Sequence, residues 1–334
     1  MSRGIKVGIG IAVSALCVWL SMRDVRPAEV WSALRRANYL GFLLVMALTL
    51  LAFLVRAIRW RSLLSTPRPV GYGSLYSATM IGFMANNLLP LRLGEFVRAW
   101  ALARREKLSK TTVLATVVVE RVVDMLTLLA ILGIALLVHP IARSSRAWDL
   151  TRRGALALVG LSVALTLFVV LLEQRPELMR RLITRGAALL PERAGEKGVA
   201  ALEHFVEGLG LFRDPARVLW VFLLSFVMFG IVIVGLQASL WSVGIDLPWY
   251  AGLTMLVVTA IGIMVPAAPG YIGTMNVACV AGLALFQVGK GAAVPFSWFY
   301  WASQWIPITL VGLYSLRREG LSLRRLGEAG EGEA

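Results

Sequence analysis

The chain has 334 residues, of which 58% are hydrophobic and 16% are charged, and its formal net charge at pH 7 is +15. Soluble globular domains average about 45–50% apolar and about 25% charged residues, so this composition excludes a soluble enzyme and a disordered chain. The apolar residues form runs of membrane-spanning length, and the basic residues lie between those runs. We therefore predict an all-α, polytopic integral membrane protein that binds no nucleic acid.

The N-terminal half of the chain predicts four spans, over residues 7–22, 39–55, 111–138 and 154–172. The first run resembles a signal peptide, but no small-residue cleavage site follows it, so we interpret it as an uncleaved helix. The mixed segment over 23–37 predicts an amphipathic interfacial connector. The segment over 73–95 begins as an apolar helix and ends in amides, proline and charges, which is typical of a re-entrant segment.

The C-terminal half predicts four more spans, over 218–241, 249–265, 272–288 and 292–316. The polar region over 173–217 is expected to form an amphipathic cytoplasmic connector. The two middle spans are joined by a Pro/Gly-broken hairpin over 266–273, and Pro295 and Pro307 predict bends in the last span. The result is about eight transmembrane helices in one domain over 1–318, followed by a short cytoplasmic tail over 319–334.

The distribution of basic residues predicts the orientation of this bundle. If the segment over 73–95 enters and leaves on one side, 24 of the 34 Lys and Arg residues fall on the side of both termini, and nine fall opposite. Positively charged loops stay in the cytoplasm, so both termini are expected there. A full crossing by this segment would weaken the bias, which favours the re-entrant interpretation.

The first group of candidate site residues lies at the end of the re-entrant segment and just beyond it. Proline and glycine break helices, and non-helical backbone at membrane depth requires contact with protein or with a wet cavity. The alternative is a cytoplasmic loop cap with solvated charges. The group comprises Asn87, Pro90, Arg92, Glu95 and Arg98.

The second group is Glu120, Arg121 and Asp124, which lie in the N-terminal half of a predicted span. Glu120 and Asp124 are four residues apart and share a helix face. Charges inside a membrane need partners, so the group is either a polar site facing the bundle interior or a structural ion-pair network. With Arg92, Arg98 and Glu95 it would form a charge-neutral set in which an arriving phosphate could replace a carboxylate on one arginine.

The third group lies at the Pro/Gly break late in the chain. Two interrupted apolar segments, one in each half, are the best sequence indication of a transporter's central site. The alternative is a plain tight turn between two spans. The candidate residues are Pro269, Gly270, Gly273 and Asn276.

Other chemistry finds little support in the sequence. Cys17 and Cys279 lie inside apolar runs without a partner at disulfide or metal-ligand spacing, and His139 and His204 are isolated. Phosphate-loop, metalloprotease, serine-hydrolase and kinase motifs are all missing. We expect no metal, no cofactor and no enzymatic activity.

The three groups together resemble the lysylphosphatidylglycerol synthase transmembrane (flippase-like) family, which includes the membrane half of the multiple peptide resistance factor. The resemblance covers roughly residues 5–318. It implies that the three groups line or brace a path along which lipid moves between leaflets. The chain departs from the family pattern at Tyr271, where a glycine is common, and at Asn276, where a glutamate is common. The missing acid argues against a cationic, lysylated head group, and the missing soluble synthase domain argues against lipid aminoacylation.

The expected function is binding and translocation of an anionic phospholipid or a lipid-linked precursor across the bacterial inner membrane. One alternative is a membrane transferase acting on a lipid-linked substrate, with Glu120 or Asp124 as general base. Another is a non-transporting assembly partner. The sequence leaves open whether the protein forms a homodimer.

Overall fold

Helices form all of the regular structure among the residues that the structure describes, as the sequence predicts. The computed structural model describes residues 3–64, 69–89, 93–138, 214–264 and 268–323, with the single positions 156, 160, 164 and 326. The predicted span over 154–172, nearly all of the predicted connector and most of the predicted tail lie outside the described residues. The total of eight spans therefore stays a prediction.

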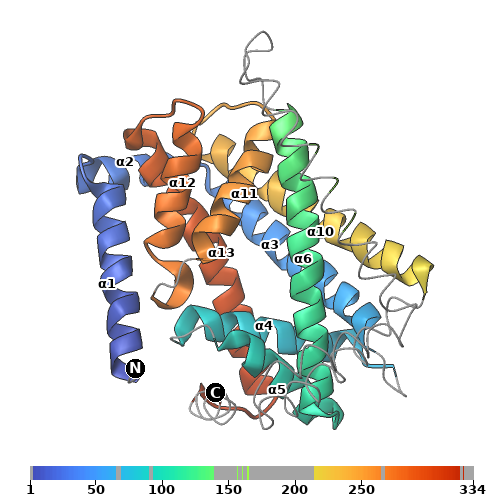
Figure 1. Cartoon of the computed structure of the whole chain (residues 1–334). Helices are drawn as coiled ribbons and strands as arrows, with labels where there is room; N and C mark the ends of the chain where they lie inside the picture. The colour runs from blue at the N-terminus through green and yellow to red at the C-terminus, as the bar shows by residue number, and fades with distance from the viewer. Residues whose placement is uncertain are drawn as a thin grey trace, which may run out of the picture. The chain divides into compact units, whose positions relative to one another are not determined.

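Three helices open the chain: α1 (Arg3–Met22), α2 (Pro27–Arg36) and α3 (Tyr39–Leu63) (Figure 1). The predicted amphipathic connector is the helix α2, which begins with proline, where a missing backbone N–H costs no intrahelical bond. The side chain of Asn38 caps α3 by accepting hydrogen bonds from the first backbone N–H groups of that helix. α3 then continues to Leu63 instead of ending at Val55, so the predicted end of this span was too early.

The segment predicted to be re-entrant is a helical hairpin of α4 (Tyr72–Leu88) and α5 (Gly94–Glu106). Glycines let the two helices approach closely: a Cβ atom added to Gly82 would lie 2.6 Å from the backbone oxygen of Gly94 and from the Cβ of Arg98. Because Gly82 precedes the break and both contacts follow it, the chain reverses direction there. The depth of this hairpin in a membrane stays a prediction.

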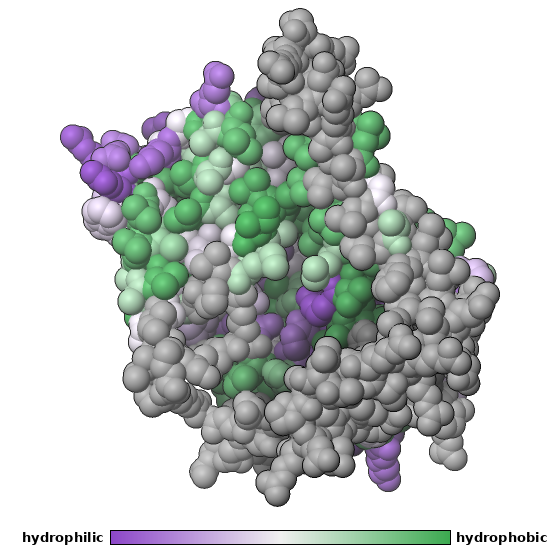
Figure 2. Space-filling view, in the orientation of Figure 1, coloured by the Kyte–Doolittle hydropathy of each residue, from purple (hydrophilic) through white to green (hydrophobic). Residues whose placement is uncertain are grey.

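Two long helices follow, α6 (Lys110–Val138) and α10 (Pro215–Ser242), close to the predicted spans. Together with α3 they are the three described helices that are long and apolar enough to cross a membrane. They expose large apolar side chains such as Leu40, Leu219 and Val234, at 79%, 71% and 57% exposure. Figure 2 shows such apolar side chains across much of the described surface. Soluble proteins rarely expose so much apolar surface, so the chain is a multi-pass membrane protein.

The last part of the chain contains α11 (Tyr250–Met264), the short 3₁₀ helix η3 (Pro269–Tyr271), α12 (Thr274–Ala284) and α13 (Lys290–Arg318). The predicted break between two helices is confirmed by the stretch from Met264 to Thr274. α12 packs against α1, α11 and α13. α13 is one continuous helix that includes both Pro295 and Pro307.

The chain forms two compact units, each assembled from separate stretches of sequence. The first unit comprises residues 1–54, 77–98 and 228–334, and the second comprises 55–76 and 99–227. The boundaries fall inside α3, α4, α5 and α10, so each of these helices contributes to both units. The predicted division into a transmembrane domain and a tail stays a prediction, although α13 ends at Arg318, where that division was drawn.

Candidate functional site

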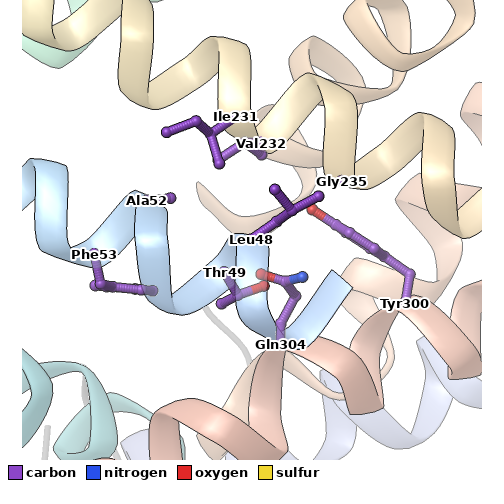
Figure 3. A pocket seen from close by; sticks show the side chains of 9 residues that line it. All are labelled: Leu48, Thr49, Ala52, Phe53, Ile231, Val232, Gly235, Tyr300 and Gln304. Carbon is purple, nitrogen blue, oxygen red and sulfur yellow. The ribbon is translucent and has the colours of Figure 1, made fainter. Parts of the chain in front are cut away.

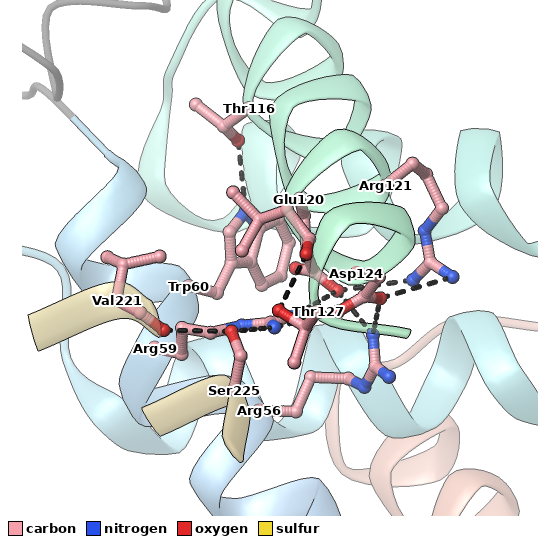
Figure 4. Close-up of polar contacts among 11 residues, drawn as sticks. Arg56, Arg59, Trp60, Thr116, Glu120, Arg121, Asp124, Thr127, Val221 and Ser225 are labelled. Carbon is pink, nitrogen blue, oxygen red and sulfur yellow. Dashed lines mark hydrogen bonds and ion pairs between the residues drawn. The ribbon is translucent and has the colours of Figure 1, made fainter. Parts of the chain in front are cut away.

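The second unit contains a cluster of five charged side chains, drawn in Figure 4, which we call the arginine–carboxylate cluster. α3 supplies two arginines three residues apart, and α6 supplies two carboxylates four residues apart with a third arginine between them. Both spacings place the side chains on one helix face. The members are Arg56, Arg59, Glu120, Arg121 and Asp124.

Each carboxylate of the cluster contacts all three arginines. Glu120 Oε1 lies 2.6 Å from Arg56 Nη1, 3.4 Å from Arg59 Nη2 and 3.2 Å from Arg121 Nη2. Asp124 lies 3.0 Å from Arg56, 2.7 Å from Arg59 and 3.6 Å from Arg121. Of these contacts between α3 and α6, those of Arg56 with Glu120 and Asp124 are hydrogen bonds, and charge-assisted bonds are about twice as strong as bonds between neutral groups. Arg56 therefore joins α3 firmly to α6.

Two hydrogen bonds to hydroxyl groups hold the innermost part of the cluster in place. Arg59 Nη1 donates to Ser225 Oγ of α10 at 2.6 Å. Next to it in sequence, the indole N–H of Trp60 donates to Thr116 Oγ1 of α6 at 2.9 Å, and both Arg59 and Trp60 are fully buried. The ends of three helices are therefore fixed around the cluster.

Burial differs sharply across the cluster. The side chains of Arg59 and Glu120 are 0% exposed, whereas the side chain of Arg121 is 40% exposed. Three guanidinium groups and two carboxylates give the five side chains a formal charge of +1. Arg121 is thus the most exposed member of a group whose formal charge is positive.

The sequence predicted three of the five members of this cluster. Glu120, Arg121 and Asp124 are brought together as expected, but Arg56 and Arg59 were assigned to a cytoplasmic loop because hydropathy falls after Val55. α3 runs through both arginines, so they belong to a helix and not to a loop, and their side of the membrane stays a prediction. Their spacing could have revealed them. Three residues apart, Arg56 and Arg59 share one helix face, and their two positive charges match the two negative charges of Glu120 and Asp124 on α6.

The proposed charge-neutral set of six residues stays a prediction. Arg92 and Pro90 lie outside the described residues. Glu95 and Arg98 belong to the first unit, whereas Glu120, Arg121 and Asp124 belong to the second.

The first unit contains the α4–α5 hairpin and its candidate residues. The side chain of Asn86 closes the hairpin by accepting a hydrogen bond from the backbone N–H of Gly94 at 2.8 Å. Asn87 donates to Thr309 Oγ1 of α13 at 3.0 Å. Glu95 is half-buried, and Arg98 is fully buried. A fully buried arginine does not fit the alternative of a loop cap with solvated charges.

The same unit brings the late Pro/Gly break next to the end of α4. Gly270 has a φ of +74°, which favours glycine, and an added Cβ would lie 3.3 Å from the backbone oxygen of Asn87. The indole N–H of Trp301 donates to the backbone oxygen of Gly270 at 2.8 Å. The two interrupted segments predicted to mark a central site therefore touch.

Asn276, at the position where the family often has glutamate, is fully buried, and its hydrogen bonds hold neighbouring parts of the fold together. Its Oδ1 accepts from the backbone N–H of Gly273 at 3.1 Å, and its Nδ2 donates to Ser297 Oγ at 3.0 Å. These bonds cap the start of α12 and join it to α13. Gly273 also has a positive φ, +88°, and lies against α1, where an added Cβ would be 2.5 Å from the backbone oxygen of Ser14.

Metal ligands do not gather anywhere in the described part of the chain, where no three His, Cys, Asp or Glu side chains come together. The expectation that the protein needs no metal or cofactor stays a prediction.

Fold and site together define a class: an all-helical, multi-pass membrane protein with a buried arginine–carboxylate cluster between two of its spans. The particular family follows from comparison with known proteins. The model of the lysylphosphatidylglycerol synthase TM region matches residues 7–312, and the chain belongs to this family.

Two curated relatives match part of the chain. Glycosyltransferase AglD of Haloferax volcanii is 29% identical over 140 residues, which are 41% of this chain and 22% of the relative. A UPF0104 membrane protein of Methanothermobacter thermautotrophicus is 28% identical over 139 residues, which are 39% of this chain and 41% of the relative. The matches thus span less than half of either relative.

Proposed function

We propose that the protein binds an anionic phospholipid or a lipid-linked precursor and moves it across the bacterial inner membrane without enzymatic turnover. The observation that carries this proposal is the arginine–carboxylate cluster, with its formal charge of +1 and a half-exposed Arg121. A phosphodiester head group carries one negative charge and would bring the sum of charges at the cluster to zero.

The mechanism follows from the unequal burial of the three arginines. Arg121 binds the phosphate first, because its guanidinium is the most exposed, and its planar fork matches two phosphate oxygens. Arg56, at 12% exposure, is the second ligand as the head group moves inward. Arg59 is fully buried and bonded to Ser225, so it stays with the carboxylates. The phosphate thereby replaces carboxylates on Arg121 and Arg56 in turn.

The proposed orientation places both termini in the cytoplasm. Arg56 and Arg59 no longer count as loop charges because they pair with Glu120 and Asp124 in the arginine–carboxylate cluster. Their removal from the 24 leaves 22 basic residues on the side of the termini against nine opposite, and the sign of the bias is unchanged.

A translocation assay tests the proposal. The full chain is reconstituted into liposomes with fluorescent phosphatidylglycerol, and dithionite reports which labelled head groups reach the outer leaflet. Hydrogen bonds to charged groups contribute about 1.5–3 kcal/mol, so Arg121→Ala should slow translocation by roughly 10- to 100-fold. Arg104→Ala is the matched control, because Arg104 is exposed and lies against the Trp100 ring. Equal rates for Arg121→Ala and wild type, at equal folded amounts, would contradict the proposal.

A transferase is the second candidate, favoured by the printed name of the Haloferax relative. The match covers 22% of that protein, so the name alone does not carry its activity over to this chain. Glu120 and Asp124 each contact three arginines, so neither can act as a base without first losing ion pairs. A lipid-linked product that forms with wild type but not with Glu120→Gln would favour the transferase over the translocase.

A further inference from the structure

The first unit contains a small cavity that lies apart from the residues discussed so far. Its volume is about 40 Å³, and it lies between α3, α10 and α13 (Figure 3). Six of its lining residues are apolar side chains or glycine: Leu48, Ala52, Phe53, Ile231, Val232 and Gly235. The other three are polar and uncharged: Thr49, Tyr300 and Gln304.

Tyr300 is the central polar residue of this cavity. It is 4% exposed, and its ring stacks on Phe296 with the centroids 6.0 Å apart. Figure 3 shows its hydroxyl pointing into the cavity, toward Gly235 on α10. That hydroxyl forms no hydrogen bond with any residue in the described part of the chain. A hydroxyl that faces a largely apolar cavity without a hydrogen-bond partner is unfavourable, so this position favours a ligand that can form a hydrogen bond.

Gln304 and Thr49 add hydrogen-bonding capacity on the same cavity. The amide nitrogen of Gln304 reaches only Ser303 Oγ, at 3.5 Å, and its amide oxygen accepts no hydrogen bond from the described residues. Thr49 donates to the backbone oxygen of Val45 at 2.9 Å and keeps its acceptor lone pairs. Donors and acceptors are therefore both present around the cavity, from α3 and α13.

We propose that this cavity binds an uncharged hydroxyl group. Neither a cation nor an anion would find an opposite charge there, because none of the nine lining residues is charged. A hydroxyl both donates and accepts, as the phenol and the amide require. A cavity needs roughly 10–15 Å³ to hold one water molecule. The cavity volume of about 40 Å³ is therefore large enough for a hydroxyl group together with the carbon atom that carries it. The hydroxyl belongs either to water or to a neutral glycerolipid.

A thermal-shift experiment on the full chain in detergent tests the proposal and separates the two sources. The probes are 1,2-dioctanoylglycerol, which has one free hydroxyl, and its methyl ether, which has none. The variants are Tyr300→Phe and Gln304→Leu, and the control is Tyr314→Phe, whose tyrosine is 66% exposed.

If a lipid hydroxyl is the ligand, dioctanoylglycerol raises the melting temperature of wild type and of Tyr314→Phe, and the ether does not. Tyr300→Phe and Gln304→Leu should each lose that rise.

If water is the ligand, neither probe acts, but Tyr300→Phe melts below Tyr314→Phe without any probe. This second result is informative because removing a hydroxyl that has no hydrogen-bond partner should not lower the melting temperature. The proposal is overturned if neither probe shifts the melting temperature and Tyr300→Phe melts with the control. Because the cavity shares no residue with the arginine–carboxylate cluster, that result would leave the proposed translocation untouched.

Discussion

Removing the charge of Asp124 should strongly destabilise the protein. Asp124 contacts three guanidinium groups, at 2.7, 3.0 and 3.6 Å, and its side chain is 8% exposed. In Asp124→Asn the same arginines lose one of the two carboxylates of the cluster, and the formal charge of the five side chains rises from +1 to +2. Breaking a buried ion pair costs about 3–5 kcal/mol, and we expect Asp124→Asn to lower the free energy of unfolding by about this amount.

A second substitution distinguishes charge balance from lost packing. Arg59→Met added to Asp124→Asn returns the formal charge to +1, and methionine occupies much of the volume of the arginine stem. We expect the double variant to lose less free energy of unfolding than the sum of the losses of the two single variants, with a coupling energy of about 1–3 kcal/mol. Recovery stays incomplete because the bond from Arg59 to Ser225 is lost.

The assay is equilibrium unfolding in mixed detergent micelles, followed by tryptophan fluorescence. Asp24→Asn is the control, because Asp24 forms an exposed ion pair with Lys290 at 3.3 Å. Such pairs contribute about 0–1 kcal/mol, and asparagine tolerates the positive φ of 76° at this position. The reasoning fails if Asp124→Asn behaves like the control, or if the two substitutions in the double variant are additive within about 0.5 kcal/mol.

Two further predictions concern the first unit. Gly94→Ala should destabilise the α4–α5 hairpin by about 1–3 kcal/mol, because the new Cβ would collide with the backbone across the hairpin. Gly73→Ala, where nothing lies within 4 Å, should be neutral or stabilising, and equal unfolding energies for the two variants would refute this. Trp301→Phe should remove the hydrogen bond from the indole N–H to the backbone oxygen of Gly270. We expect the backbone amides that follow Gly270 to exchange hydrogen faster as a result. Trp241→Phe, at an exposed position, should leave that exchange rate unchanged; equal rates in both variants would count against the Trp301 contact.

The sequence predicted the apolar helices well, because hydropathy alone determines where a long apolar helix lies. The described ends of α6 and α10 fall within a few residues of the prediction. α3 was the exception, since Arg56 and Arg59 lower the hydropathy of its last turns. Their charges are compensated by carboxylates more than sixty residues later, and hydropathy carries no information about such a partner.

The candidate site was harder to predict than the helices, because its contacts depend on tertiary packing. Glu120 and Asp124 could be expected to need partners, but their own sequence neighbourhood offers only Arg121. Asn87 and Gly270 could be singled out as irregular, yet their proximity depends on how α4 and α13 pack. Tyr300 stands among several aromatic residues of the last span, and only its surroundings distinguish it from Trp298 or Trp301.

The redundancy of the arginine–carboxylate cluster explains how one set of ion pairs can both stabilise the fold and release a guanidinium. Since each carboxylate contacts three arginines, the departure of Arg121 leaves Glu120 and Asp124 with two arginines each. Arg121→Ala should therefore lower the free energy of unfolding by only about 1 kcal/mol, within the range of exposed pairs, while it slows translocation.

Arg59→Met should mainly lower the free energy of unfolding, unlike Arg121→Ala, because Arg59 is fully buried and hydrogen-bonded to α10. Its loss removes ion pairs that no exposed group replaces, and we expect a loss of about 3 kcal/mol or more. The unfolding energies and the translocation rates of both variants distinguish two hypotheses for the cluster, a structural network and a transport site. A purely structural network requires translocation to fall only as the folded fraction falls. A transport site requires Arg121→Ala to lose translocation while the protein stays folded.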